Sequence, residues 1–191
     1  MPFLWCYCLS QAMLKLAEKI AALQRTILFS ELGPEDQEAL ASRAVEHKLD
    51  RGETLFVAGE PAAGLYVIVE GAIRAYRVSS DGREQVIHVE RDGATLAEIP
   101  VFDGGPYPSS TAAEEDSVLL FIRREDVLRL CLERPQISLA ALRLLAARMR
   151  NCAALVERLS LRDVDRRVAQ LLLEEASEYG NRAMSWNSSL R

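Results

Sequence analysis

Histidine is scarce in this chain, and that scarcity bears on whether it is a metal-dependent enzyme. The 191 residues include two histidines, His47 and His88, which are 41 positions apart and form no H-x-H pair. Catalytic iron and zinc sites in β-barrel enzymes need clustered histidine and carboxylate ligands. The sequence therefore argues against a metalloenzyme of the cupin sort, and we expect a protein that is not an enzyme and has no metal site.

Long apolar runs are also missing. No run approaches the roughly 20 residues that a membrane-spanning helix needs. The opening MPFLWCYCLS lacks a basic front and a small-residue cleavage site, so it is not interpreted as a signal peptide, and Met13 is an alternative start. We therefore expect a cytoplasmic protein without membrane contact. Its four cysteines are then expected to be reduced thiols: Cys6, Cys8, Cys131 and Cys152.

Charge is unevenly distributed along the chain. Residues 1–122 contain 10 basic and 19 acidic side chains, whereas residues 123–191 contain 13 arginines and 9 acidic side chains. Such a split is compatible with an acidic sensing half and a second half that can approach a polyanion. Charge runs also mark ordinary solvated faces, so this pattern supports the interpretation without deciding it.

Short β-rich runs separated by glycine dominate residues 49–123. The runs TLFVA, GLYVIVE, AIRAYRV, QVIHVE and SVLLFIR are rich in valine, isoleucine, tyrosine and phenylalanine. Glu70-Gly71 and Asp81-Gly82 are typical of hairpin turns, because glycine tolerates positive φ. Several short strands at regular spacing predict an antiparallel sandwich or barrel. Helices are expected on either side, at residues 11–28, after Gly33-Pro34 and at residues 123–134, which makes the fold class α+β.

A heptad pattern marks residues 135–160, PQISLAALRLLAARMRNCAALVERLS. An apolar seam at this period calls for a second helix, because one narrow stripe is not buried by its own helix. We expect a dimerisation helix that pairs with its copy in a second chain; the alternative is a core helix packed on its own domain. The predicted interface residues occupy the two core positions of the heptad: Leu142, Met149 and Val156 at one, and Leu145, Cys152 and Leu159 at the other.

The spacing of several motifs resembles a known family. The stretch RGETLFVAGEPAAGLYVIVEGAIRAYRVSSDGRE, then GATLAEIPVFDGGPYPSSTAAEEDSVLLFI and the long helix, resemble the cyclic-nucleotide-binding-type β-roll of the CRP/FNR family of bacterial transcription regulators. The resemblance covers residues 28 to about 180. It implies an antiparallel roll of the jelly-roll type that senses a small molecule and dimer helices that relay the signal. It also implies a C-terminal winged helix-turn-helix that reads a palindromic DNA site.

The segment LAEIPVFDGGPYPSS matches the family's phosphate-binding cassette, with one departure. Glu98 matches the glutamate that binds the ribose hydroxyl in cyclic-nucleotide members. The cassette arginine is absent, because Tyr107 or Pro108 stands in its place, and neither can make its bidentate contact to a phosphate. Cys152-Ala153 stand where the adenine-contacting Thr-Ser pair would be. Both departures argue against cyclic AMP as the ligand. The expected ligand-binding residues are Glu98, Ile99, Tyr107, Ser109, Ser110, Arg148 and Cys152.

The resemblance also implies a pairing between Glu98 and Arg148, which aligns with a family arginine that approaches the cassette glutamate. The alternative is a surface arginine and a solvated glutamate. The GGPYP cassette is more similar to the branch of nitric-oxide and redox-responsive regulators, some of which hold haem. Haem stays an alternative cofactor, with His47, His88, the cysteines and the methionines as the ligands on offer. Cys6 and Cys8 form one pair without a third N-terminal partner, which argues against an iron–sulfur cluster.

The C-terminal part departs from the family most. Residues 162–179 resemble the first helix of the DNA-binding domain, but 11 residues follow Gly180, where the family needs roughly 40 for two more helices and a wing. Arg162, Arg166 and Arg167 could contact DNA phosphates without reading sequence. We therefore expect four parts: an N-terminal segment (1–27), the roll (28–134), the dimerisation helix (135–160) and an incomplete winged helix-turn-helix (161–191).

These observations together predict a homodimeric regulator that senses a small-molecule effector, with DNA as a partner in a full-length form. A stand-alone cyclic-nucleotide-binding module without DNA binding is the alternative.

Overall fold

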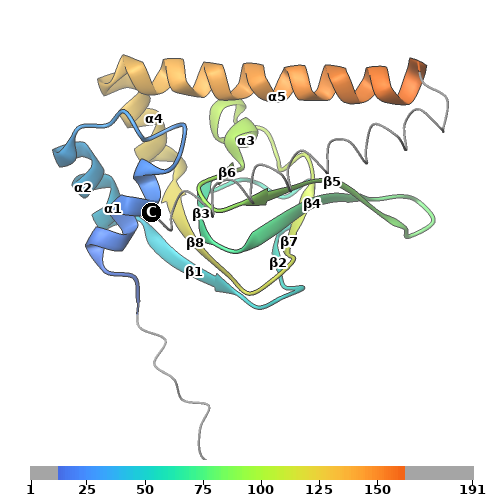
Figure 1. Cartoon of the computed structure of the whole chain (residues 1–191), viewed down its shortest axis with the longest axis horizontal. Helices are drawn as coiled ribbons and strands as arrows, with labels where there is room; N and C mark the ends of the chain where they lie inside the picture. Colours follow the sequence, from blue (N-terminus) through green and yellow to red (C-terminus); the bar gives the residue numbers. More distant parts are fainter. Residues whose placement is uncertain (1–12, 162–191) are drawn as a thin grey trace, which may run out of the picture. The chain divides into compact units, whose positions relative to one another are not determined.

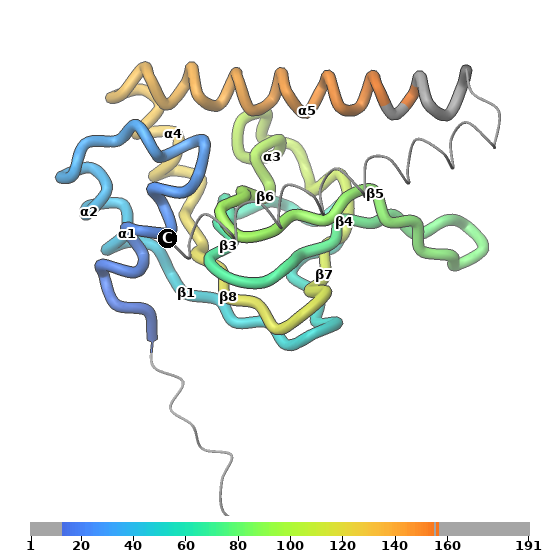
Figure 2. Tube along the Cα trace, in the orientation of Figure 1, coloured from blue at the N-terminus to red at the C-terminus, as the bar shows by residue number. Residues whose placement is uncertain are grey.

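The computed structural model describes residues 13–161, with the backbone alone for residue 155 and residues 157–161 (Figure 2). The chain divides into two compact units, residues 1–145 and 146–191. The helix expected over residues 162–179 and the expected phosphate contacts Arg162, Arg166 and Arg167 lie outside the described residues. The division into four parts stays a prediction.

Among residues 13–161, eight strands form two antiparallel four-stranded sheets (Figure 1). One sheet has the order β1-β8-β3-β6 and the other the order β2-β7-β4-β5. This arrangement confirms the expected antiparallel roll. The strands are β1 (Val45–Leu49), β2 (Thr54–Phe56), β3 (Gly64–Glu70), β4 (Ala72–Val78), β5 (Glu84–Arg91), β6 (Thr95–Leu96), β7 (Ser110–Ala113) and β8 (Ser117–Arg123).

Five helices flank or follow the roll within the described residues. The expected helix after Gly33 is confirmed, and Pro34 occupies its first turn, where a missing N–H group has no cost. The last helix is the long one that the heptad pattern predicts. The helices are α1 (Leu16–Gln24), α2 (Pro34–Arg43), α3 (Glu98–Asp103), α4 (Arg124–Glu133) and α5 (Pro135–Leu161).

Both hairpin turns named from the sequence form as expected. Gly71 joins β3 to β4 with a φ of 106°, and Gly82 lies in the β4–β5 turn with a φ of 81°. Other residues would be strained at these angles. A side chain at Gly71 would also collide with Ser117, because its Cβ would lie 2.3 Å from the Ser117 hydroxyl oxygen.

The space between the two sheets is filled by one apolar cluster. Successive residues of β3 point to opposite faces, so Tyr66 and Ile68 face this cluster while Leu65 and Val67 face the helices. Burial on both faces explains why GLYVIVE is nearly all apolar. The inter-sheet cluster consists of Leu49, Phe56, Tyr66, Ile68, Ile73, Leu96, Tyr107, Ala113 and Leu119.

A second cluster lies between the β3 and β8 strands and the helices. It includes Leu23 of α1, Leu40 of α2 and Val127 of α4, all buried. The first turns of α5 belong to it as well, through Ile137 and Ala140, which are 0% and 3% exposed. The start of α5 is therefore fixed to the roll by apolar packing.

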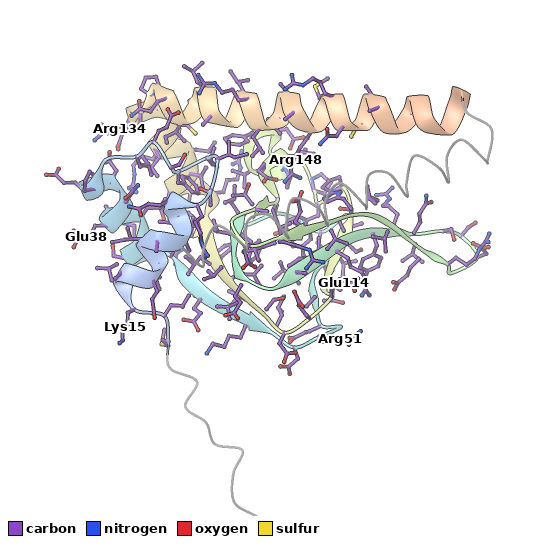
Figure 3. All side chains as sticks on the ribbon, viewed as in Figure 1. Lys15, Glu38, Arg51, Glu114, Arg134 and Arg148 are labelled. Carbon is purple, nitrogen blue, oxygen red and sulfur yellow. The ribbon has the colours of Figure 1, made fainter. Side chains whose placement is uncertain are left out.

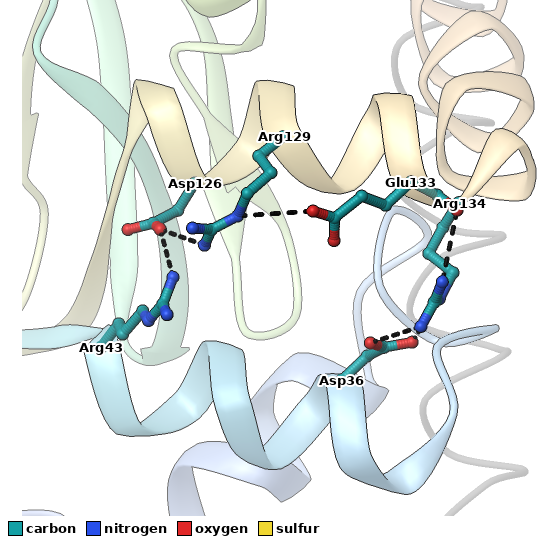
Figure 4. A network of polar contacts seen from close by, with 6 residues as sticks. All are labelled: Asp36, Arg43, Asp126, Arg129, Glu133 and Arg134. Atoms are coloured by element: carbon teal, nitrogen blue, oxygen red, sulfur yellow. Dashed lines mark hydrogen bonds and ion pairs between the residues drawn. The ribbon is translucent and has the colours of Figure 1, made fainter.

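Ion pairs join α2 to α4 over this core (Figure 4). Arg134, directly after α4, contacts Asp36 with two nitrogens, at 2.6 and 3.0 Å. Asp126 accepts from both Arg43 and Arg129, at 2.9 and 2.6 Å. The Asp36 contact raises the pKa of Arg134. Because most of these groups are partly exposed, the pairs fix the direction of α4 more than they stabilise the fold.

Candidate functional site

The predicted cassette runs from β6 through α3 and a loop to β7. Glu98 is the first residue of α3 and is 1% exposed, although glutamate is rarely buried so fully. The hydroxyl of Thr95, itself buried, donates a hydrogen bond to the Glu98 carboxylate. The fold therefore keeps one carboxylate inside the roll at the start of the cassette helix. Its predicted pairing with Arg148 stays a prediction.

Ala97, just before α3, has a left-handed conformation with φ 70° and ψ 25°. It is the one residue other than glycine with positive φ among residues 13–161. An alanine in this region costs about 1–2 kcal/mol relative to the ordinary conformations. The chain accepts this strain where it turns from β6 into α3 and directs Glu98 inward.

We expect Ala97→Gly to raise the free energy of unfolding by about 0.5 kcal/mol. Glycine removes the left-handed strain, and its greater freedom in the unfolded chain offsets part of that gain. Urea unfolding at constant pH measures the change. Ala112→Gly, in the extended strand β7, is the matched control and should lower stability instead. Equal destabilisation by both changes would contradict the assignment of strain to Ala97.

The loop after α3 is held to the β2–β3 connection. Gly59 N–H donates to the Tyr107 carbonyl at 2.9 Å, and Tyr107 N–H donates to the Glu60 carbonyl at 3.0 Å. The guanidinium of Arg124 donates from Nε to the Val101 carbonyl of α3 at 2.8 Å. These hydrogen bonds hold the loop and α3 through their backbone N–H and carbonyl groups.

Tyr107 anchors this loop in the inter-sheet core. Its ring stacks on Phe56, with centroids 3.8 Å apart and planes at 10°, and the residue is 5% exposed. Tyr66 lies beside the pair, with its ring centroid 5.9 Å from that of Phe56. The Tyr107 ring therefore serves the core, and its expected role toward a ligand stays a prediction.

Burial raises the pKa of Tyr66 to about 12, with smaller contributions from the charge of Tyr107 and a hydrogen bond to it. The ordinary value is 10. As the pH rises above 10, the unfolded state therefore loses this proton before the folded state does. We expect stability to fall between pH 10 and 12 and Tyr66→Phe to reduce that slope. Denaturant unfolding across this range tests it, with Tyr76→Phe as control, and an unchanged slope for Tyr66→Phe would contradict it.

The other expected ligand residues are spread over three elements. Ile99 lies on α3 and is 45% exposed, Ser109 is half-buried, and the Ser110 hydroxyl of β7 accepts a hydrogen bond from Ala58 N–H at 3.0 Å. Arg148 (Figure 3) and Cys152 lie on α5 within the second unit. The structure places Glu98, Ile99, Ser109 and Ser110 in one continuous cassette segment. Their roles stay predictions.

The heptad stripe on α5 is exposed in the single chain. Leu142, Met149 and Val156 are 62%, 74% and 61% exposed. Cys152 is exposed and Leu145 is half-buried, whereas the Leu159 side chain is outside the described set. Large apolar side chains are seldom this exposed at regular spacing without a partner surface.

The two histidines lie in different sheets. His47 on β1 contacts the ring edges of Tyr66 and Phe121, and the His88 side chain on β5 is 41% exposed and 3.7 Å from Glu90. Among residues 13–161, no three histidine, cysteine or acidic side chains are grouped so that they could hold a metal. Over the same residues, no helix combines the length and apolar character that crossing a membrane requires.

Comparisons with known proteins agree with this geometry. Residues 46–134 match the cyclic nucleotide-binding domain family. A CRP-like cAMP-activated global transcriptional regulator of Mycobacterium tuberculosis is 32% identical over 158 residues, which cover 83% of this chain and 70% of that protein. The cyclic AMP receptor protein of Thermus thermophilus is 30% identical over 147 residues, which cover 77% of this chain and 68% of that protein.

A solved structure shows the same architecture. The sensor domain of the transcriptional regulator DNR from Pseudomonas aeruginosa superimposes with a TM-score of 0.65 at 25% identity, covering 78% of this chain and 97% of that domain. The overall fold is thus one that this chain shares with the sensor domain of a transcription regulator. The chain belongs to the CRP/FNR family of transcription regulators.

Proposed function

We propose that this protein is a homodimeric transcription regulator whose β-roll senses a small-molecule effector and whose α5 helices relay the signal toward DNA. The observation that carries the proposal is the exposed stripe of Leu142, Met149 and Val156, which repeats every seven residues along α5. A heptad seam is self-complementary in a parallel pair, so a second copy of the chain is the partner that fits it. The relatives are transcription regulators, which supports DNA as the output.

The relay follows from how α5 begins. Its first turns are packed into the roll through Ile137 and Ala140, while the stripe farther along is available to a partner. An effector bound at the cassette that favours one packing of α4 and α5 would shift the equilibrium between two arrangements of the dimer. The ligand needs only a differential affinity for those arrangements.

Cross-linking through Cys152 tests the proposed seam. In a parallel pair in heptad register, Cys152 faces its own copy, so oxidation with copper phenanthroline should produce a disulfide-linked dimer. The experiment uses the full chain with Cys6→Ser and Cys8→Ser. Adding Cys152→Ser should abolish the cross-link, whereas adding Cys131→Ser, which removes a half-buried thiol of α4, should preserve it. A chain that sediments as a monomer at micromolar concentration would overturn the proposal.

A stand-alone cyclic-nucleotide-binding module is the second candidate. Its nucleotide ligand is favoured by the two relatives whose names include cyclic AMP. It is opposed by the cassette, where Tyr107 or Pro108 stands in place of the family arginine. Titration calorimetry with cAMP, combined with sedimentation, separates the candidates, because this module would bind the nucleotide as a monomer.

A further inference from the structure

The inter-sheet face of the second sheet contains a hydroxyl without a partner. Thr111 on β7 is 2% exposed, and its Oγ1 has no hydrogen-bond partner among residues 13–161. A buried hydroxyl in this state costs free energy that a ligand could recover. Thr111 lies opposite Ala75 of β4, and the next pair on this face is Ala113 with Ile73. Because Ala113 and Ile73 belong to the inter-sheet core, Thr111 points into the same space.

Arg77 continues this row toward the cassette. It lies two residues beyond Ala75 on β4, so its side chain leaves the sheet on the same face as Ala75 and Thr111. Its Nη1 donates a hydrogen bond to the carbonyl oxygen of Pro108. Residues 107 and 108 are where the sequence lacks the family arginine. A guanidinium from β4 therefore reaches the place that the cassette leaves without a cation.

The charge of Arg77 is also uncommitted within the described part of the chain. Among residues 13–161, no carboxylate lies within ion-pair distance of its guanidinium. In contrast, Arg74 on the opposite face of β4 contacts Glu84 and Glu114, each at 3.4 Å, and packs over the Tyr76 ring (Glu114 is labelled in Figure 3). One hydrogen bond to Pro108 leaves several of the five guanidinium N–H groups available, and these fit an oxyanion better than a neutral group.

We propose that Arg77 supplies the cation of this cassette, with the Thr111 hydroxyl beside it, so that the effector presents a small oxyanion, such as a cyclic phosphate, to β4. This inference rests on the proposed effector-sensing function and names the chemistry of the ligand. It revises the expectation from the sequence alone, in which the missing cassette arginine argued against a phosphate-bearing ligand. Arg77 thereby becomes a specificity-determining residue contributed by a strand outside the cassette.

The test compares charged probes with uncharged ones on the full chain at constant ionic strength. The charged probes are cAMP, cGMP and inorganic phosphate, and the uncharged partners are adenosine and guanosine. We expect calorimetry to show tighter binding of cAMP or cGMP than of the matching nucleoside. Arg77→Gln should weaken binding of the charged probe by about 10- to 100-fold and leave the affinity for the nucleoside unchanged. Arg77→Lys should restore part of the loss, because a lysine keeps the charge without the bidentate geometry.

Two further variants complete the design. Arg83→Gln removes a guanidinium from the same hairpin that is already paired with Asp81, so it should bind as the wild type does. Thr111→Val should raise the melting temperature of the free protein and lower its affinity for the charged probe. A purely structural role for Thr111 would not give this combination. The proposal is overturned if no charged probe binds at millimolar concentration or if nucleotide and nucleoside bind equally. It is also overturned if the Arg77→Gln variant shows the same difference in affinity between nucleotide and nucleoside as the wild type. Sedimentation of each variant reports the dimer independently of these outcomes.

Discussion

Replacing Met149 by glutamate is expected to convert the proposed dimer into a monomer at micromolar concentration. Met149 is 74% exposed in the single chain and lies in the middle of the stripe, between Leu142 and Val156. In a symmetric pair, the change would bury two carboxylates against each other and against apolar side chains. Such burial costs several kcal/mol, and about 3 kcal/mol already weakens association more than 100-fold.

Sedimentation equilibrium measures this effect directly. Arg150→Glu is the matched control, because it introduces the same glutamate side chain, with a larger change in charge, next to Met149 at a position outside the seam. It should leave the mass of the dimer unchanged. A dimer that tolerates Met149→Glu would show that the stripe is covered by something other than its copy. Circular dichroism at the same concentration would show whether the variant keeps its helices.

Replacing Tyr107 by alanine is expected to lower the free energy of unfolding by about 3–4 kcal/mol. The ring is buried and stacked on Phe56 at 3.8 Å, so its removal leaves a cavity between the sheets. Tyr107→Phe keeps the ring and loses the phenol oxygen, so it should cost about 1 kcal/mol. The difference separates the packing of the ring from its polar contact with Tyr66.

Urea unfolding of the two variants gives both values. Tyr76→Ala removes an aromatic ring from the face of β4 opposite the inter-sheet core, so it shows how much of the effect is specific to that core. If Tyr107→Ala unfolds like the wild type, the ring does not anchor the cassette loop. A cost of similar size for Tyr107→Phe and Tyr107→Ala would instead assign the stability to the phenol.

Most of the strands that the sequence predicted have apolar residues on a buried face; β5 is nearly all exposed and was predicted from its β-branched residues alone. β3, β4 and β8 match the predicted runs to the residue, and β2 and β5 agree to within two residues. β1 was not predicted, because VEHKL is mostly exposed and has no apolar alternation. β7 was missed for the opposite reason: its four small residues are all buried, and they owe that burial to neighbouring strands rather than to their own hydrophobicity.

The site was only partly accessible from the sequence. Glu98 could be named because the cassette motif places it, whereas α3 itself is too short, and interrupted by Pro100, to show a helical period. Arg77 could not be singled out in the same way, since its contact with Pro108 joins residues 31 positions apart through the pairing of β4 with β7. A single sequence does not show such pairings. The sequence therefore predicts a cassette without a cation, whereas in the fold the Arg77 guanidinium of β4 lies beside it.

The cassette begins in one sheet and ends in the other, since β6 pairs with β3 while β7 pairs with β2 and β4. The cassette therefore connects the two sheets, and Leu96 and Tyr107 attach it to the inter-sheet core at either end. A ligand bound to the cassette should therefore oppose separation of the two sheets. Occupancy should accordingly slow hydrogen exchange in strands of both sheets at once, including strands that never touch the occupant.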